Sequence, residues 1–208
     1  MAEIKEVHST LRKRAKRMAP GERRQQLNEC AVRVFSRFGL GNAGHAQVAD
    51  EADVSTPTVF LYMPNRQALI DSVLAEIDRY LVDLVVNAAA GEETASGKLL
   101  AVTHAFAAAT DSDPDYVKVF LNWSTVVHEE SWPQYVSFQD HILALFETII
   151  EDGIRTGEIP SAVNPIWGAH LVMGSAHMIA QMKFRGRDQR DINDFLEALI
   201  HGALLDRL

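Results

Sequence analysis

The segment 45–69 constrains this chain more than any other, because it fits two short helices joined by a tight turn. The first helix is expected at about 46–52, with an apolar face made of Val48, Ala49 and Ala52. Ser55 is placed to cap the second helix, with Pro57 in its first turn, where a missing N–H costs nothing. Pro64 ends this helix, because the residue before a proline disfavours helical geometry. The segment therefore predicts a helix-turn-helix, whose second helix suits a DNA major groove.

The second helix of this segment is expected to have an inner and an outer face. The residues expected to face inward are Val59, Phe60 and Met63. Four side chains remain for the outer face: Thr56, Thr58, Leu61 and Tyr62. Hydroxyl groups reach phosphates and base edges, and the methyl group of threonine contacts that of thymine. We therefore expect the DNA contacts of this helix to come from Ser55 and the outer-face residues. The alternative is an ordinary helical corner without DNA contacts.

The charge of the chain is unevenly distributed. The net charge is −8, yet residues 1–66 hold 11 Lys and Arg against 7 Asp and Glu, while the remainder holds 9 against 21. A basic end joined to an acidic body is expected when only that end meets DNA. The basic residues that we expect to contact DNA precede the first helix, and they are Arg12, Arg14, Lys16 and Arg17. Such an arm often enters the minor groove, and a merely solvated tail is the alternative.

Composition limits the class of protein. The single cysteine, Cys30, excludes a disulfide framework and fits a reducing compartment, and we expect its side chain to be a small buried apolar group. No apolar run reaches the length of a membrane span, and no hydrophobic segment follows the basic N-terminus as it would in a secretory signal. We therefore expect a cytoplasmic protein that makes no membrane contact.

Two patterns resemble nucleotide-binding or metal-binding motifs, but the surrounding sequence or the spacing does not match either motif. Residues 39–44 carry three spaced glycines, but an amphipathic helix precedes them instead of the strand that a dinucleotide loop requires. Gly39 is expected to end the first helix, with a flexible turn to Gly44. His170 and His177 lie seven residues apart, which is not the spacing of a helical metal pair. We expect no cofactor, no bound metal and no enzymatic activity.

Helical periodicity recurs along the chain, without the alternation typical of strands. We expect an all-α fold, in which an N-terminal three-helix helix-turn-helix domain is joined by a long helix to a C-terminal helical domain for ligand binding and dimerisation. The expected domains are the basic N-terminal arm at 1–18, the DNA-binding domain at 19–66 and the regulatory domain at 67–208. The expected helices, about nine in number, cover about 20–38, 46–52, 55–62, 66–87, 94–110, 115–128, 133–156, 165–184 and 191–205. The core face of the first helix is expected to consist of Leu27, Ala31, Val34, Phe35 and Phe38.

Several motifs give the chain a resemblance to a known family. The pair Phe38-Gly39, the helix-turn-helix, the run Tyr62-Met63-Pro64-Asn65-Arg66 and Leu69 resemble the signature of TetR-family regulators. The pairs Trp123-Ser124 and Trp132-Pro133, with the run Arg155-x-Gly157-Glu158, resemble the branch of quorum-sensing master regulators of the LuxR/HapR/SmcR type.

This resemblance adds expectations about DNA contacts. It implies that backbone N–H groups of Gly44 and His45 lie beside a phosphate, and it adds Arg66 to the DNA-binding residues. The branch carries two arginines, two positions apart, that read the minor groove, and here Arg17 keeps the second place while Ala15 stands in the first. The branch also has a base-reading asparagine in the recognition helix, where this chain has Leu61.

The C-terminal half carries the expectations for ligand and partner. The resemblance implies a mostly apolar pocket for a small molecule, with Tyr116 and Gln139 as polar anchors. Its expected residues are Leu81, Leu84, Val85, Tyr116, Trp123, Gln139, Leu143 and Ala176. Small residues on the eighth helix and a wide apolar face on the ninth predict a four-helix dimer interface, although both faces are alternatively part of the core. Its expected residues are Gly174, Ile192, Phe195, Leu196, Leu199, Ile200 and Ala203.

The function expected from these features is sequence-specific transcriptional regulation by a homodimer on a palindromic double-stranded DNA operator. The resemblance implies quorum-sensing-type control, with repression or activation left open. The alternative is a helical small-molecule-binding protein with little or no DNA specificity. An architectural DNA binder is a further alternative and predicts little sequence preference.

Overall fold

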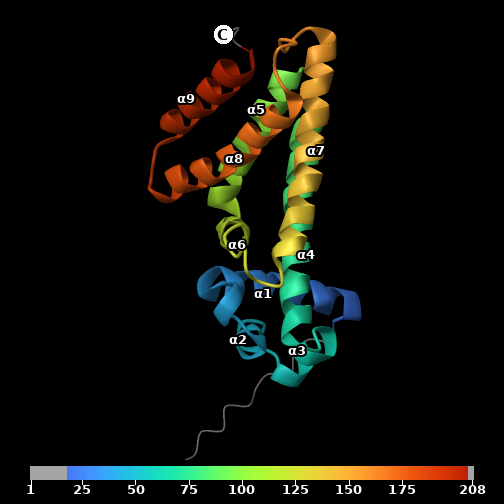
Figure 1. The fold of residues 1–208 in the computed structure, drawn as a ribbon. Coiled ribbons are helices and arrows are strands. Elements are labelled where there is room, and N and C mark those ends of the chain that lie inside the picture. The colour runs from blue at the N-terminus through green and yellow to red at the C-terminus, as the bar shows by residue number, and fades with distance from the viewer. Residues whose placement is uncertain (1–17, 206–208) are drawn as a thin grey trace, which may run out of the picture.

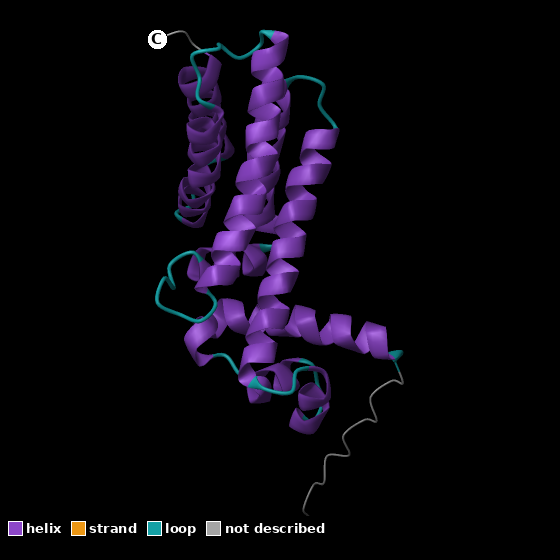
Figure 2. Cartoon of the chain, turned by 45° about the vertical axis from the view of Figure 1, so that its right-hand side comes forward, coloured by secondary structure: helices purple, strands orange, loops and turns teal. Residues whose placement is uncertain are grey.

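A computed structural model describes residues 18–205, and all regular elements within that range are helices (Figures 1 and 2). The prediction of an all-α fold is confirmed. Figure 1 shows an elongated molecule with the helix-turn-helix at its lower end and the C-terminal helices at the other end. The elements are α1 (Pro20–Asn42), α2 (His45–Glu51), α3 (Thr56–Tyr62), α4 (Arg66–Ala90), α5 (Ala95–Ser112), α6 (Pro114–Trp123), α7 (Trp132–Thr156), α8 (Pro165–Phe184), α9 (Gln189–Ile200) and the π-helical turn η1 (His201–Leu205).

The helices at the lower end form a small core around α1. Four of the five residues predicted for the core face of α1 are buried, namely Leu27, Ala31, Val34 and Phe35. The prediction for Phe38 is wrong, because 46% of its surface is exposed beside a kink at Gly39. Gly39 has φ +74° and ψ 167°, a conformation that a residue with a Cβ rarely adopts. Helical geometry resumes after the kink up to Asn42, where the sequence predicted a flexible turn.

The long helix α4 connects the lower end to the rest of the molecule and runs beside α7 (Figures 1 and 2). Asn65 begins α4 by accepting a hydrogen bond on its side-chain oxygen from the N–H of Ala68, at 2.8 Å. Its buried face packs against α1 and α5. One continuous helix therefore contacts both the helix-turn-helix end and the upper bundle.

The upper bundle consists of α4, α5, α7, α8 and α9 packed around apolar side chains. The close approach of α7 to α5 requires Gly153, since a Cβ there would lie 2.7 Å from the Cβ of Ala95. Gly157 ends α7 in the left-handed conformation, with φ 80°, as the sequence predicted.

Two helix ends differ from the sequence prediction. The predicted sixth helix extended to about residue 128, whereas α6 ends at Trp123. The indole N–H of Trp123 donates to the carbonyl of Ser131 at 3.2 Å, which draws the following segment back across the end of the helix. The predicted ninth helix is α9 followed by η1, because the hydrogen-bonding pattern changes at His201.

Candidate DNA interface and ligand pocket

The turn between α2 and α3 is defined by local hydrogen bonds. Asp53 takes φ +50°, a conformation that aspartate tolerates better than most residues, and the N–H of Val54 donates to the carbonyl of Ala49 at 3.0 Å. Ser55 begins α3, and its hydroxyl accepts from the N–H of Thr58 at 3.3 Å and lies 2.8 Å from the hydroxyl of the same residue. The predicted cap at Ser55 is confirmed, and it gives α3 a fixed start.

The two faces of α3 are sharply different in burial. Val59 and Met63 are buried as predicted, at 0% and 1% exposure. Phe60 was predicted to face inward, and that is wrong, because it is 44% exposed. Its ring instead stacks on the ring of His45, with centroids 4.0 Å apart. Leu61 is 83% exposed, which leaves α3 with an open outer surface rich in apolar groups.

One side chain holds the end of α3, and another holds the turn between α1 and α2. A ring nitrogen of His45 lies 2.8 Å from the carbonyl oxygen of Met63, which connects the start of α2 to the end of α3. The guanidinium of Arg66 donates to the carbonyls of Leu40 at 2.7 Å and Gly41 at 2.6 Å, and also to that of Ala43. These hydrogen bonds hold the turn between α1 and α2, while Arg66 itself is exposed, and its contact with DNA stays a prediction.

A second set of charges joins α1 to α2. The carboxylate of Glu51 accepts from Arg33 at 2.8 Å and from Arg37. The hydrogen bonds from Arg33 and Arg37 lower the pKa of Glu51 below its usual range. Nearby, the guanidinium of Arg24 lies 6.0 Å from the ring centre of Tyr62, a half-buried residue at the end of α3. These contacts hold α1, α2 and α3 together as one unit.

The other predicted DNA contacts divide into described and undescribed residues. Thr56 and Thr58 are half-buried, and so are Gly44 and His45 at the start of α2. The predicted arm residues lie outside the described range, and they are Arg12, Arg14, Lys16 and Arg17.

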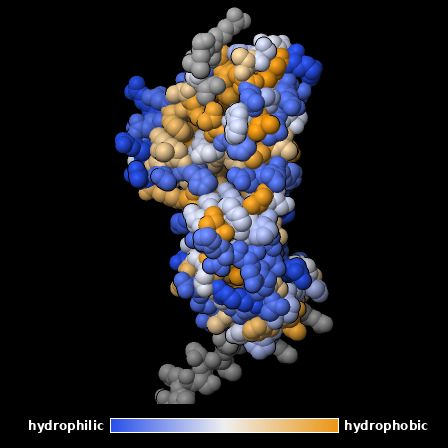
Figure 3. Space-filling model, in the orientation of Figure 1, coloured by the Kyte–Doolittle hydropathy of each residue, from blue (hydrophilic) through white to orange (hydrophobic). Residues whose placement is uncertain are grey.

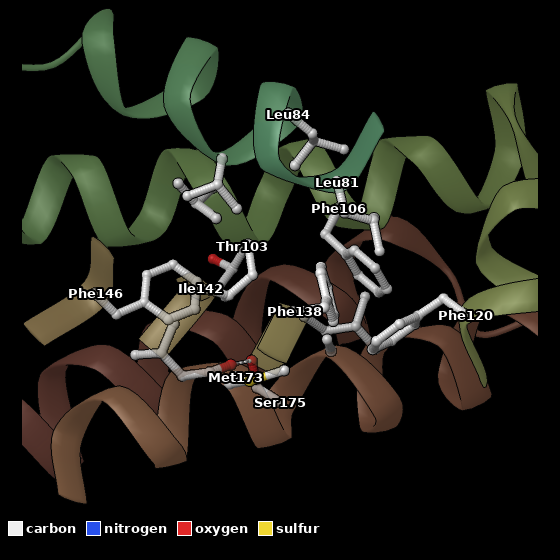
Figure 4. A pocket seen from close by; sticks show the side chains of 15 residues that line it. Leu81, Leu84, Thr103, Phe106, Phe120, Phe138, Ile142, Phe146, Met173 and Ser175 are labelled. Atoms are coloured by element: carbon white, nitrogen blue, oxygen red, sulfur yellow. Dashed lines mark hydrogen bonds between the residues drawn. The ribbon is translucent and has the colours of Figure 1, made fainter. Parts of the chain in front are cut away.

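A cavity of about 50 Å³ lies between α4, α5, α7 and α8, with α6 at one end (Figure 4). Its only lining residues with side-chain polar atoms are Thr103 and Ser175. The hydroxyl of Thr103 donates to the carbonyl of Leu100 at 2.9 Å, and that of Ser175 to the carbonyl of Val172 at 2.6 Å. Both hydroxyls are thus engaged by their own helices. The lining residues are Leu81, Leu84, Val85, Val102, Thr103, Phe106, Phe120, Phe138, Ile142, Phe146, Val172, Met173, Ser175, Ala176 and Ile179.

The structure places half of the expected pocket residues around this cavity, namely Leu81, Leu84, Val85 and Ala176. The expectation of Tyr116 as a polar anchor is corrected, because its hydroxyl donates to the carboxylate of Glu76 at 3.3 Å. Trp123 is 1% exposed and bonded to Ser131, and neither Gln139 nor Leu143 lines the cavity. The sequence missed the aromatic residues of α5, α6 and α7, because helical periodicity does not distinguish a cavity wall from a filled core.

One wall of the cavity is connected to the helix-turn-helix end by α6. Phe120 lines the cavity, and the side-chain oxygen of Asn122 on the same helix accepts from the N–H of Leu40 at 3.0 Å. Near the start of α6, Asp115 accepts from the hydroxyl of Ser36 at 2.6 Å. A displacement of α6 would therefore act directly on α1.

The face of α8 that points away from the bundle is apolar and exposed. Exposure is 66% at Trp167, 49% at Leu171 and 48% at Met178, and a Cβ built on Gly174 between them meets nothing within 4 Å. Figure 3 shows apolar side chains in orange and tan over the region where α8 and α9 lie in Figure 1.

The expected dimer residues on α9 divide into two groups. The expectation that Ile192, Leu196 and Ile200 form an interface is corrected, because all three are fully buried within the subunit, where α9 packs on α5 and α8. Phe195 and Leu199 are half-buried. The side chain of Ala203 lies outside the described set.

Neither a metal site nor a membrane span is found in the part of the chain that the structure describes. In that part of the chain, no group of three or more histidine, cysteine, aspartate or glutamate side chains is arranged to hold a metal ion. No helix within it is both long and apolar enough to cross a membrane.

The chain is similar to known transcriptional regulators in both sequence and structure. Residues 92–181 match the model for the C-terminal domain of tetracyclin repressor-like proteins. The HTH-type transcriptional regulator LuxR of Vibrio harveyi is 29% identical over 184 residues, which covers 88% of this chain and 90% of that protein. Over residues 92–181 the chain matches a TetR-type C-terminal domain, and along most of its length it is similar to TetR-family transcriptional regulators. Regulators of this family bind DNA operators and act as dimers.

Solved structures of TetR-like regulators share the fold of this chain. A TetR-like transcriptional regulator from Rhodococcus sp. RHA1 superposes with a TM-score of 0.72 at 20% identity, covering 89% of this chain and 98% of the other. The transcriptional regulator FadR from Bacillus subtilis, solved in complex with stearoyl-CoA, gives a TM-score of 0.72 at 19% identity, covering 86% and 98%. At these identities the likeness establishes the fold alone.

Proposed function

We propose that this TetR-family regulator binds a palindromic operator sequence-specifically as a homodimer, with α3 of each subunit in a major groove. The observation that carries this proposal is the placement of α3, which is capped at Ser55, joined to α2 through His45 and open on its outer face. A helix held in this way presents side chains to base edges without further ordering. The half-buried residues Thr56, Thr58 and Tyr62 contribute phosphate or base contacts through their hydroxyl groups, and the basic arm contributes phosphate neutralisation.

The apolar face of α8 supports the homodimer. Trp167, Leu171 and Met178 form a continuous exposed stripe on one side of α8, and Gly174 within it leaves room for close approach of a second helix. A two-fold dimer would bring two copies of this stripe together, with Phe195 and Leu199 of α9 at its margin. Such a dimer presents two α3 helices to two half-sites of a palindrome.

The cavity supports regulation by a small apolar ligand. About 50 Å³ is one third of the ~150 Å³ needed to hold benzene in a helical protein, so any larger molecule must separate the surrounding helices. Such separation would move Phe120 and hence α6. A hydrogen bond from the N–H of Leu40 to the side chain of Asn122 connects α6 to α1. The ligand would therefore bind one arrangement of the subunits better than another, which is the requirement for changing DNA affinity. Resemblance to the LuxR-type branch supports quorum-sensing-type control.

The test is selection of bound sequences from a random DNA pool with purified full-length protein at physiological salt. We expect enrichment of a palindrome about 20 base pairs long, since two half-sites one to two helical turns apart match a two-fold dimer. Thr58→Ala should weaken the enriched site more than random DNA, whereas Val127→Ala, on the exposed loop after α6, should change neither. Enrichment of a non-repeated site would contradict the two-fold arrangement.

The arm is tested with the enriched operator. Deletion of residues 1–17 should reduce the slope of log affinity against log salt by at least one unit, because each neutralised phosphate contributes about that much. An unchanged slope would contradict the role of the arm.

A second candidate function is a helical small-molecule-binding protein with little DNA specificity. The observation behind it is the apolar cavity between α4, α5, α7 and α8, which could hold a ligand whether or not α3 binds DNA. A folded dimer that enriches no sequence, while an apolar ligand raises its melting temperature, would support this candidate and contradict the first.

A further inference from the structure

The outer surface of α3 lacks the side chains that usually read bases by hydrogen bonding. Residues 54–65 contain no lysine, arginine, aspartate or glutamate, and the one amide among them is Asn65. Guanine is normally read by arginine or lysine, and adenine by asparagine or glutamine, each through paired hydrogen bonds. The oxygen of Asn65 instead accepts from the N–H of Ala68, as the cap of α4. None of these readouts is available from α3 itself.

The hydroxyl groups at the start of α3 are also partly engaged. The hydroxyls of Ser55 and Thr58 bond to each other, and that of Ser55 accepts from the N–H of Thr58 as well. The nearest guanidinium after α3, that of Arg66, is used by three backbone carbonyls. The paired hydrogen bonds that discriminate guanine and adenine are therefore not supplied by this helix, which leaves single hydroxyl contacts and apolar contacts.

Apolar groups take the most exposed positions of the helix. Leu61 is 83% exposed, the largest fraction among the exposed large apolar residues of the described chain. Phe60 beside it is 44% exposed, with its ring stacked on His45. Contact of an apolar side chain with water is unfavourable, so a binding surface that removes Leu61 from water makes the free energy of binding more favourable. In the major groove, the apolar group at a base edge is the C5-methyl group of thymine.

We propose that Leu61 reads the C5-methyl group of a pyrimidine, so that the protein selects thymine at one position of each half-site and accepts 5-methylcytosine there. A methylated cytosine carries the same methyl group at the same ring carbon as thymine. This inference rests on the proposed function, since it requires α3 to enter the major groove. It assigns base discrimination to Leu61 and makes cytosine methylation a property of DNA to which this protein responds.

The expected effect follows from the size of one methyl group. Burying one such group changes affinity by about fourfold, and a two-fold dimer contacts two of them. Removing both methyl groups should therefore weaken binding by about fifteenfold.

The experiment uses the operator enriched from the random pool and full-length protein. Each thymine is replaced in turn by 2′-deoxyuridine, which lacks only the C5-methyl group, and the dissociation constant is measured by fluorescence anisotropy at fixed salt. We expect one position per half-site to lose about fourfold in affinity. Leu61→Ala should lose affinity for the thymine operator and become insensitive to deoxyuridine at that position. Val127→Ala, an equally conservative truncation remote from α3, should behave as the unaltered protein.

A second arm tests methylcytosine directly. A C·G pair replaces the T·A pair at the sensitive position, with or without a C5-methyl group on the cytosine. The methyl group should raise affinity by about fourfold per half-site in the unaltered protein and leave Leu61→Ala unchanged.

Three results would overturn the inference, and one of them separates it from the proposed function. Equal affinity for thymine and deoxyuridine at every position excludes methyl readout, although an enriched operator would still support regulation. Equal losses in the unaltered protein and Leu61→Ala assign the methyl effect to DNA stiffness or to another residue. Failure to enrich any sequence removes the proposed function and this inference with it.

Discussion

Leu171 offers the sharpest test of the dimer. The side chain lies near the middle of the exposed face of α8, one turn from Gly174, and 49% of it is exposed in the single subunit. Leu171→Ala leaves the helix intact because alanine is the best helix former. The substitution therefore removes apolar surface from the proposed interface without disturbing the subunit.

The magnitude follows from burial and symmetry. Complete burial of a leucine side chain is worth about 1.5–3 kcal/mol, so covering its exposed half contributes about 1 kcal/mol. A two-fold interface contains Leu171 twice, which gives about 2 kcal/mol per dimer. At 1.4 kcal/mol for each factor of ten, the dimer dissociation constant should rise by about 30-fold.

Sedimentation equilibrium over a range of protein concentrations measures this constant directly. Val127→Ala is the matched control, because Val127 is 47% exposed on the loop between α6 and α7, away from α8. It should leave the dissociation constant unchanged. Equal constants for Leu171→Ala and the control would refute the assignment of this face, as would a subunit that is monomeric before any substitution.

Three further predictions concern stability, each measured by urea or acid unfolding. Gly153→Ala should destabilise the protein by ~1–3 kcal/mol, because a Cβ there would lie 2.7 Å from side-chain atoms of α5 and of the segment after α7, whereas Gly21→Ala, with open space, should cost nothing. Burial lowers the pKa of His177 below its ordinary 6.5, because the charged imidazole is disfavoured inside the protein. The free energy of unfolding should therefore decrease as the pH drops below 6.5, and His177→Gln should make this decrease smaller. Burial acts to raise the pKa of Glu158, but hydrogen bonds from Ser96 and the N–H of Ala95 outweigh it and lower the pKa. The stability that Glu158 contributes above its ordinary pKa of 4.5 should therefore be lost below it, and Glu158→Gln should lack this acid-sensitive part.

The helices were predictable where their ends depend on neighbouring residues. Ser55 caps α3 through a bond three residues away, and Gly157 ends α7 through its own backbone conformation. The end of α6 was not predictable in this way, because the indole of Trp123 reaches a carbonyl eight residues later. Long apolar runs gave the number of helices but not the point where each one stops.

The candidate sites divide similarly. Turn chemistry located the helix-turn-helix, because the cap and the turn depend on consecutive residues. The commitment of Arg66 to backbone carbonyls was not visible, because its partners lie about 25 residues earlier in the chain. The cavity was predicted in part, because a periodic pattern identifies an apolar face but not the helix that will pack against it.

The sequence by itself determined an all-α chain with a helix-turn-helix near its basic end, because helical period, caps and turns act over a few residues. Tertiary structure decided which apolar residues stay in water. Phe60 and Leu61 remain exposed on α3, while Ile192 and Leu196 of α9 are covered by the subunit itself. Burial depends on which distant segment packs against a given face of a helix. The residue pattern within that helix does not specify the segment.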